Sequence, residues 1–376
     1  MAENAAILSA IKPGKAGKSI GTIVLNKPKA LNALDHNMAE SMLSLLEEWA
    51  SDDNITCVCV YGAGDKAFCA GGDVVSMHKA MTAQPEQTPS SVEAFFTTEY
   101  RLDYLIHTYN KPIIVVGHGF VMGGGMGLFC GASHKVVTPS SRLAMPEITI
   151  GLFPDVGGTY FLPRLGRGMG LFLGLTGIPF NAADALFVGM ADHHIADGNI
   201  DAVIDALLDI EWSADSEHGK QVTQVLEQFT VPATNPSKLA QYQHEIAALD
   251  KADSVIEVAA MLEGLNRDDK WINRAVGNFT KGSPITAHVV FEQIRRGAHL
   301  NLAEAFRLEL NMACTCAALG EFQEGVRALL IDKDNSPNWR YKQLDEVPDD
   351  VIAKHFTPIW AGATHPLSHL EMKGTS

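Results

Sequence analysis

Two acidic residues, Glu147 and Asp155, stand in a stretch that is otherwise short of charge, with the apolar segment ITIGLFP between them. Burying a carboxylate costs free energy unless it has a partner or a purpose, and perturbed carboxylates are typical of functional sites. We interpret the two as the acid and base of one site. Taken alone, a glutamate followed by a Pro-Asp turn is more often a capped loop than a catalytic pair. The interpretation therefore depends on the residues around them.

A run of three glycines precedes these acids in the segment VMGGGMGL, and a pair of glycines lies earlier in CAGGDV. Glycines that follow a strand let the backbone approach a ligand closely, and the first amides of the next helix point toward negative charge. In isolation the pair is typical of an ordinary turn. Amides near Gly72 and Gly124 could converge on one carbonyl oxygen, and each preorganised donor to an oxyanion contributes on the order of 3 kcal/mol. We predict an oxyanion hole suited to a thioester carbonyl.

Other catalytic chemistries have less support. The six cysteines have the spacing of neither a zinc site nor a dithiol redox motif. The histidines include the pair His193-His194, but no HExxH or comparable spacing indicates a metal site, so we expect no bound metal and a surface or interface position for this pair. His118 lies between glycines of a predicted strand, and we interpret it as a satisfied core histidine. No serine lies in a GxSxG elbow, which argues against a hydrolase triad.

The elements that must position these residues alternate between strands and helices. Apolar segments bounded by turn residues predict strands at 19–25, 55–62 and 113–121. Asp73 follows the glycine pair and is well placed as the N-cap of a helix, and another helix is expected from about Gly125. Such alternation, with turns made by paired glycines, indicates an α/β layered core in which sites collect at the ends of strands.

The character of the chain changes near Asp197, after which long segments with helical periodicity dominate, such as DAVIDALLDIEW. We therefore expect a core domain over residues 1–196 and a mainly helical region with an extended tail over residues 197–376. With 376 residues, the chain is long enough to bury a substantial core.

Composition argues against two classes of partner. The chain has 44 Asp and Glu against 29 Lys and Arg, for a formal charge of -15, which repels nucleic acid and anionic lipid. The most apolar run, 113–132, contains His118 and many glycines, so we interpret it as a buried strand, a turn and the start of a helix rather than a membrane span. We expect no nucleic acid and no membrane partner, and any anionic ligand must be held by local donors.

Four segments together resemble the crotonase superfamily: KALNAL, FCAGGDV, HGFVMGGGMGL and AMPEITIGLFPDVGGTYFLPRLG. The last is most similar to the 3-hydroxyisobutyryl-CoA hydrolases, and the likeness extends from about Gly21 to Trp339. The resemblance implies an α/β fold, a crotonase-like spiral of ββα units with a mainly helical C-terminal region that covers the site and often mediates homo-oligomer contacts. It also implies an acyl-CoA substrate and no cofactor, since the CoA is part of the substrate.

Carried over by position, the resemblance makes Gly72 and Gly124 the amide donors of the oxyanion hole. It makes Glu147 and Asp155 the catalytic acids, and Glu99 matches a glutamate that contacts the substrate. A further set falls where the family places the adenine and pantetheine groups of CoA, a weaker transfer because many such contacts use the backbone: Lys29, Ala30, Ala70 and Asp73.

One departure from the family bears on the reaction. Enoyl-CoA hydratases of the superfamily carry a second glutamate shortly after the glycines, whereas the matching position here is Gly127. This disfavours addition of water to a double bond by two glutamates and favours hydrolysis of 3-hydroxyisobutyryl-CoA, a step of valine breakdown. Glu147 would act as nucleophile or as general base, and Asp155 would orient the substrate hydroxyl or transfer a proton. Two alternatives stay open: an enoyl-CoA hydratase or isomerase that uses Glu147 alone, and a non-catalytic acyl-CoA binder.

The compartment is the last expectation. The amino terminus lacks the long apolar core of a signal peptide, and its lysines come without the arginines of a transit sequence, so we expect the chain to begin close to its mature end. The cysteine pattern favours a reducing compartment. Together with the likeness, this predicts the cytoplasm of a bacterium, or the mitochondrial matrix if the source is a eukaryote.

Overall fold

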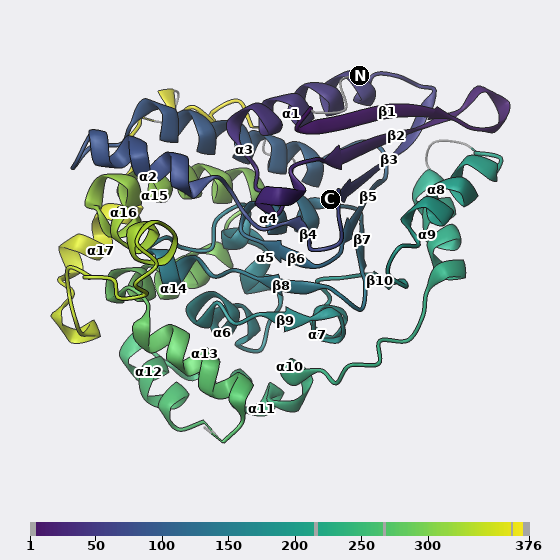
Figure 1. Cartoon of the computed structure of the whole chain (residues 1–376). Helices are drawn as coiled ribbons and strands as arrows, with labels where there is room; N and C mark the ends of the chain where they lie inside the picture. The colour runs from purple at the N-terminus through teal and green to yellow at the C-terminus, as the bar shows by residue number, and fades with distance from the viewer. Residues whose placement is uncertain (1–4, 214–216, 266–267, 362–363, 371–376) are drawn as a thin grey trace. The chain divides into compact units, whose positions relative to one another are not determined.

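The computed structural model describes residues 5–213, 217–265, 268–361 and 364–370 (Figure 1). The expectation about the amino terminus includes residues 1–4, which lie outside the described part, and it stays a prediction. The chain divides into two compact units, each assembled from segments that are distant in sequence. This division by compactness does not test the predicted division at residue 196, which also stays a prediction. The first unit comprises Met1–Gly72, Arg101–Leu143 and Phe180–Ala240, and the second comprises Asp73–Tyr100, Ala144–Pro179 and Gln241–Ser376.

A sheet in the order β1-β2-β3-β5-β7-β10 forms the centre of the first unit (Figure 1). The edge strand β1 is antiparallel to β2, and the remaining neighbours pair in parallel. The predicted strands at 19–25 and 55–62 are confirmed. Each is an apolar run that ends at turn residues, which is why the sequence shows it clearly. The strands are β1 (Ile7–Pro13), β2 (Ser19–Leu25), β3 (Ile55–Gly62), β5 (Ile113–Gly117), β7 (His134–Val137) and β10 (His193–His194).

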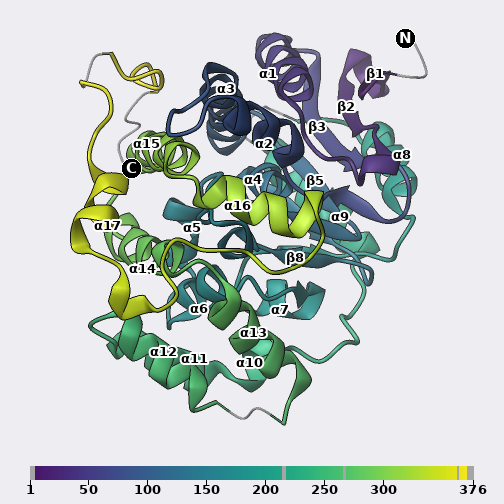
Figure 2. The ribbon, with the colours of Figure 1, turned by 60° about the vertical axis from the view of Figure 1, so that its left-hand side comes forward.

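Helices cover both faces of this sheet (Figure 2). On one face lies α1 (His36–Ala50), whose Trp49 ring would be only 2.6 Å from a Cβ on Gly21 of β2, so glycine is needed for this close packing. The neighbouring Ile20 points to the opposite face, because successive strand residues alternate. There it packs in a buried apolar cluster with residues of α8 (Ile200–Asp209) and α9 (His218–Phe229).

A second, smaller sheet has the order β4-β6-β8-β9. The single strand predicted at 113–121 is wrong, since the chain leaves the large sheet after β5 and enters the small one at β6. The break falls at Gly119, whose φ of 56° favours glycine and where a Cβ would overlap the Lys66 carbonyl. The strands of the small sheet are β4 (Ala67–Cys69), β6 (Phe120–Met122), β8 (Arg142–Ala144) and β9 (Phe180–Asn181).

Helices dominate the second unit, and several pack closely against one another. On α6 (Met169–Thr176), a Cβ at Gly174 would lie 3.1 Å from Val290 of α14 (Pro284–Gly297). The predicted extended tail is wrong in part, because it contains α17 (Asp349–Phe356). Among the described residues, no helix has both the length and the apolar composition to cross a membrane. The remaining helices along the chain are α2 (Val74–Ala83), α3 (Ser90–His107), α4 (Gly124–Gly131), α5 (Gly158–Arg164), α7 (Ala182–Phe187), α10 (Lys238–Gln241), α11 (Gln243–Ala248), α12 (Val255–Glu263), α13 (Lys270–Lys281), α15 (Leu302–Leu319) and α16 (Glu321–Val326).

Candidate active site

The two glycine turns lie against each other in the first unit. A Cβ on Gly71 would be 3.6 Å from the Met122 carbonyl oxygen and 4.0 Å from the Cα of Gly123. Gly124 is the first residue of α4, so the helix itself offers its amide no carbonyl partner. A Cβ on Gly125 would overlap the carbonyl oxygen of Cys69, so glycine alone lets the start of α4 approach the end of β4 this closely. The structure therefore brings together the two turns that the sequence singled out.

The segment KALNAL is fixed beside the first of these turns. Asn32 is fully buried, and its side-chain amide donates to the carbonyls of Ala63 at 3.0 Å and Ala67 at 2.8 Å. The Ala70 amide donates to Leu31 at 3.0 Å, and the Leu34 amide donates to the Gly71 carbonyl at 2.9 Å. These bonds tie the segment to the loop that carries Gly72.

One of the two predicted CoA-binding residues of this segment, Lys29, borders a small hollow, whereas Ala30 does not line it. Lys29 and Ala30 are exposed on a single 3-10 turn, Pro28–Ala30. The hollow has a volume of about 230 Å³, and the Lys29 and Lys66 side chains are the cations among its lining residues. Asp65 is the carboxylate among the same lining residues, so the two lysines leave the hollow with a net positive charge, which suits a phosphate-bearing group. Its lining residues are Pro28, Lys29, Leu31, Asn32, Ala63, Gly64, Asp65, Lys66 and Ala67.

Asp73 is confirmed as an N-cap. Its side chain accepts from the Ser76 amide at 3.2 Å and from the Ser76 hydroxyl at 2.7 Å, at the start of α2. Both carboxylate oxygens thus accept hydrogen bonds from Ser76, one of them from its backbone amide.

In the second unit, Glu147 opens a 3-10 turn, Glu147–Ile150, and its side chain is only 4% exposed. Its Oε2 atom has no hydrogen-bond partner among the described residues. Burial raises the pKa of Glu147 well above its ordinary range, and the charge of Asp155 raises it further. A buried carboxyl oxygen without a partner is costly to keep, which is typical of a group reserved for a ligand.

Asp155 is equally buried and has a specific partner. The Tyr100 hydroxyl donates to its Oδ2 atom at 2.7 Å. Burial raises the pKa of Asp155 to about 7, while the bond from Tyr100 acts in the opposite direction. The carboxyl group can therefore hold or release a proton near neutral pH.

Glu99 is adjacent to Tyr100 on α3 and is 2% exposed, and its Oε1 atom also has no partner in the described part of the chain. Burial raises its pKa well above the ordinary range, and the charges of Asp155, Glu147 and Glu309 add to this. The second unit thus brings the three predicted acids into one electrostatically coupled cluster, together with a fourth acid that the sequence analysis did not select.

Glu309 and Tyr100 are the residues that sequence reasoning missed. Glu309 belongs to α15, where Phe306 and Leu310 are buried on the same side. A glutamate at a buried position of an otherwise apolar helix face was a usable signal, because Glu is almost never fully buried unless it is paired.

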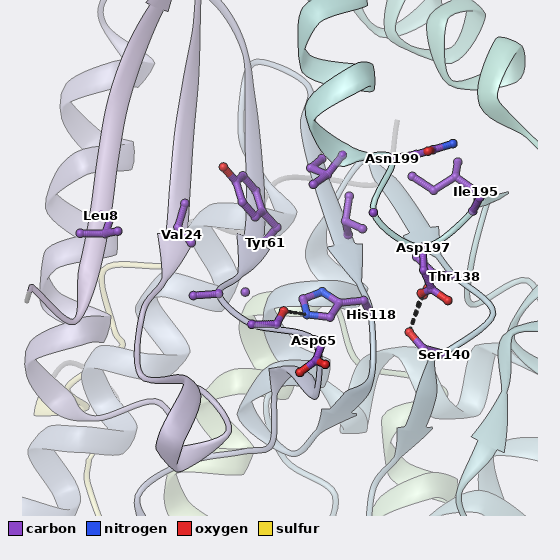
Figure 3. Close-up of a pocket in the computed structure, with 17 residues that line it drawn as sticks. Leu8, Val24, Tyr61, Asp65, His118, Thr138, Ser140, Ile195, Asp197 and Asn199 are labelled. Carbon is purple, nitrogen blue, oxygen red and sulfur yellow. Dashed lines mark hydrogen bonds between the residues drawn. The ribbon is translucent and has the colours of Figure 1, made fainter. Parts of the chain in front are cut away.

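A larger pocket of about 720 Å³ lies at the carboxyl ends of the parallel strands in the first unit (Figure 3). His118 lines it, half-buried, with its Nε2 atom 2.9 Å from the Gly64 carbonyl oxygen, so the prediction of a core histidine is wrong. Burial lowers the pKa of His118. Asp197 also lines the pocket and accepts from the Ser140 hydroxyl at 2.6 Å. None of the predicted site residues lines this pocket.

The prediction for His193-His194 is also wrong. Both are buried in β10, at 9% and 4% exposure, and His194 Nδ1 lies 2.8 Å from the Val231 carbonyl oxygen. They form the last strand of the sheet and pair in parallel with Val136 and Val137 of β7.

Comparisons with known proteins agree with this architecture. The family model described as enoyl-CoA hydratase/isomerase matches residues 20–356. The mitochondrial 3-hydroxyisobutyryl-CoA hydrolase of Danio rerio is 38% identical over 346 residues, which are 92% of this chain and 88% of the relative. The human protein of the same name is 34% identical over 341 residues, which are 90% of this chain and 86% of the relative.

Two solved structures are similar over nearly the whole chain. A carnitinyl-CoA dehydratase from Mycobacterium thermoresistibile has a TM-score of 0.83 and 34% identity, covering 95% of this chain and 97% of that one. An enoyl-CoA hydratase from Rhodobacter sphaeroides has a TM-score of 0.80 and 32% identity, covering 93% and 97%. The predicted fold class is confirmed by these neighbours. The chain belongs to the enoyl-CoA hydratase/isomerase family and has the crotonase fold with a helical C-terminal region.

Proposed function

We propose that this chain hydrolyses 3-hydroxyisobutyryl-CoA to 3-hydroxyisobutyrate and CoA, a step of valine breakdown. The observation that carries the proposal is Glu147, a buried carboxylate with one oxygen that has no partner among the described residues and with Asp155 as an electrostatic neighbour. The relatives that are named for this reaction match about nine tenths of the chain.

The thioester oxygen would accept hydrogen bonds from the amides of Gly72 and Gly124. The close approach of the two glycine turns supports this assignment, because a Cβ on Gly71 would already touch the second turn. Each such donor stabilises the developing oxyanion by on the order of 3 kcal/mol, since it is fixed before the reaction begins.

Glu147 acts on the carbonyl carbon by one of two routes. As nucleophile, its carboxylate forms a C–O bond and the C–S bond breaks, leaving a mixed anhydride and CoA thiolate, and water then cleaves the anhydride. As general base, Glu147 takes a proton from water, the hydroxide attacks, and the C–S bond breaks directly. In both routes the departing thiolate takes up a proton to become the CoA thiol. Asp155 can supply this proton, because a pKa of about 7 keeps a fraction of its carboxyl groups protonated at neutral pH.

The same acids would select the acyl group. Asp155 would orient the 3-hydroxyl of the substrate, and Glu99 would bind that hydroxyl through its unpaired Oε1 atom. Because burial and neighbouring charges raise the pKa of Glu99, its carboxyl group is available as a hydrogen-bond donor as well as an acceptor.

The nucleotide end of CoA would occupy the hollow beside Lys29. A chain with a formal charge of -15 must attract an anionic ligand locally, and Lys29 and Lys66 provide cations there. Ala30 and Ala70 would contribute backbone contacts. Asp73 would act through its backbone as well, because its carboxylate caps α2.

The compartment and assembly are part of the proposal. The described cysteines are free and mostly buried, which supports a reducing compartment, either a bacterial cytoplasm or the matrix of a mitochondrion, where the relatives' names place them. A homo-oligomer is proposed because members of this family often form one. Sedimentation velocity at several protein concentrations tests it.

A second candidate function is an enoyl-CoA hydratase that uses Glu147 alone. The solved structures with TM-scores of 0.83 and 0.80 carry the titles of a dehydratase and a hydratase, which favours it. Against it, the position of the second hydratase glutamate is Gly127, which is buried within α4 and supplies no acid.

Thiol release from a panel of acyl-CoAs separates the candidates, with wild type beside Glu147→Gln and Asp155→Asn. We expect CoA release from 3-hydroxyisobutyryl-CoA by wild type, reduced on the order of a thousandfold in Glu147→Gln, as for loss of a general base. Loss of enoyl absorbance without thiol would favour the hydratase. Binding without either reaction would leave only an acyl-CoA binder. Single-turnover hydrolysis in oxygen-18 water then tests the anhydride route, since label enters the Glu147 carboxylate only when water attacks the Glu147 carbonyl of an anhydride.

A further inference from the structure

The turn that presents Asp155 has an unusual backbone. Val156, the next residue, has a φ of 50°, and Gly157 has a φ of 92°. A β-branched residue in the left-handed region is a genuine outlier, and such strain persists only where the surrounding structure over-determines it. The contacts that hold this turn therefore decide where the Asp155 carboxylate points.

Glu309 of α15 holds the turn on its carboxyl side. Its Oε2 atom accepts from the Gly157 amide at 2.8 Å, and its Oε1 atom accepts from the Thr159 amide at 2.8 Å. The side chain is 0% exposed. Only a carboxylate satisfies both amides at once, because the NH₂ group of a glutamine would face one of them as a second donor.

Gln293 of α14 holds the other side. Its Nε2 atom donates to the Pro154 carbonyl oxygen at 2.6 Å and to the Thr159 hydroxyl at 2.8 Å, and the side chain is fully buried. Asp155 is thus enclosed between two buried polar side chains that contact the backbone before and after it.

The same helix α15 also supports the partner of Asp155. The Phe306 ring lies 5.8 Å from the Tyr100 ring, centroid to centroid. Phe306 and Glu309 are three residues apart, so they lie on one face of the helix. One face of α15 therefore contacts both the donor and the turn of the acceptor in the Tyr100–Asp155 hydrogen bond.

We propose that Glu309 is a positioning residue for the reaction: by accepting from Gly157 and Thr159 it fixes the strained turn so that the Asp155 carboxyl meets Tyr100 and the substrate. The inference rests on the proposed hydrolysis, in which Asp155 takes part. It also assigns a role to the C-terminal helices that goes beyond covering the site, since α14 and α15 hold a catalytic side chain in place.

The test is a double-mutant cycle on the full chain, measured as CoA release from 3-hydroxyisobutyryl-CoA. We expect Glu309→Gln to lower kcat by on the order of a hundredfold, as for a displacement of about 1 Å at a reacting group, with KM changed less than about twofold because CoA contacts lie elsewhere. In the Asp155→Asn background, the same substitution should lower kcat no further. A residue that only stabilises the fold would lower kcat equally in both backgrounds, and that result would overturn the proposal.

Glu321→Gln is the matched control. Glu321 is another buried glutamate of the second unit, which accepts from the Ser283 hydroxyl and the Arg340 amide. It should leave kcat close to wild type and should be additive with Asp155→Asn.

Amide hydrogen exchange distinguishes failure of this inference from failure of the proposed function. In Glu309→Gln, and not in Glu321→Gln, the Gly157 and Thr159 amides should exchange at least tenfold faster than in wild type. If wild type released no CoA but this change occurred, the hydrolase would be wrong and the positioning contact would stand. If wild type released CoA but Glu309→Gln kept its kcat and its exchange rates, the positioning role would be wrong.

Discussion

The Tyr100 hydroxyl and the Asp155 carboxylate form a buried hydrogen bond of 2.7 Å between residues 55 positions apart in sequence. Burial raises the pKa of Tyr100 well above its ordinary range, so the phenol stays protonated and always donates. Burial favours the neutral form of Asp155, whereas the bond from Tyr100 and a backbone hydrogen bond favour the ionised form, and the pKa of about 7 is the balance of these influences. A carboxyl group that titrates near neutrality is suited to proton transfer at physiological pH.

Tyr100→Phe should shift this balance. Without the donor, the pKa of Asp155 rises above about 7, because the larger of the two hydrogen bonds that oppose the effect of burial is lost. Because Asp155 supplies a proton in the proposed reaction, its protonated form is needed and the basic limb of the kcat profile moves to higher pH. A bond to a charged group is worth about 1.5–3 kcal/mol, or one to two pH units. The profile between pH 5 and 9 measures it. Tyr109→Phe, which removes a hydroxyl bonded to the Leu46 carbonyl, is the control and should leave the profile unchanged. An unshifted limb in Tyr100→Phe would contradict the assignment.

The acid cluster should also make the protein less stable as pH rises. The pKa of Asp155 is raised from 3.8 to about 7, and those of Glu147 and Glu99 are raised well above their ordinary 4.5. At pH values between the ordinary pKa of each group and its raised pKa, the folded state retains protons that the unfolded state has released. The free energy of unfolding therefore falls with rising pH. Urea unfolding at pH 7 and 8.5 should show a lower midpoint at pH 8.5. Both values lie above the range in which the buried histidines, whose pKa values are lowered, change stability in the opposite sense.

Glu147→Gln is the variant that tests this source of pH dependence. Removing one raised carboxyl should make the midpoint less sensitive to pH and should raise stability at pH 8.5, while it removes activity. Glu263→Gln, at the exposed end of α12, is the control and should keep the wild-type slope. A midpoint in Glu147→Gln that falls as steeply as in wild type would show that this carboxyl is not responsible.

Local patterns explain which parts of this site could be predicted. The glycine turns and the Asp73 cap depend on neighbouring residues, so the sequence predicted them well, and the acids Glu147 and Asp155 stood out against an apolar background. The edge strand β1 was not predicted, because its residues are mostly half-buried and alternate only weakly. Short strands are equally hard to recognise, because their burial patterns cover only a few residues.

Long-range contacts explain what was missed. Glu309 meets the Gly157 amide across 152 positions of sequence, and nothing local to either residue encodes that pairing. The same holds for Gln293, which contacts Pro154 from 139 positions away. The break between β5 and β6 was missed because it results from the backbone of Lys66 meeting Gly119, a tertiary contact that a strand-like run of apolar residues does not reveal.

The lysines beside the small hollow should affect CoA binding and not the chemical step. Lys29→Ala and Lys66→Ala should each raise KM by about two- to fivefold, as for exposed ion pairs worth up to about 1 kcal/mol, with kcat unchanged. The effect should shrink at high salt, because exposed charges are screened. Lys79→Ala on α2 is the control. If KM responds to Lys79 as much as to Lys29, the attraction is a general effect of charge and the hollow has no special role.

Gly125→Ala should disturb the oxyanion hole through the backbone. The new Cβ would overlap the Cys69 carbonyl oxygen, so the start of α4 must move and carry the Gly124 amide with it. Loss of one oxyanion donor lowers kcat by about a hundred- to a thousandfold, and the protein should also lose stability. Gly219→Ala in α9 is the matched control, because a Cβ there meets nothing within 4 Å. That substitution should stabilise the protein by about 0.4–1 kcal/mol and leave kcat unchanged. Steady-state kinetics and thermal unfolding of both variants provide the comparison, and a fully active Gly125→Ala would mean that the Gly124 amide does not contact the reacting carbonyl.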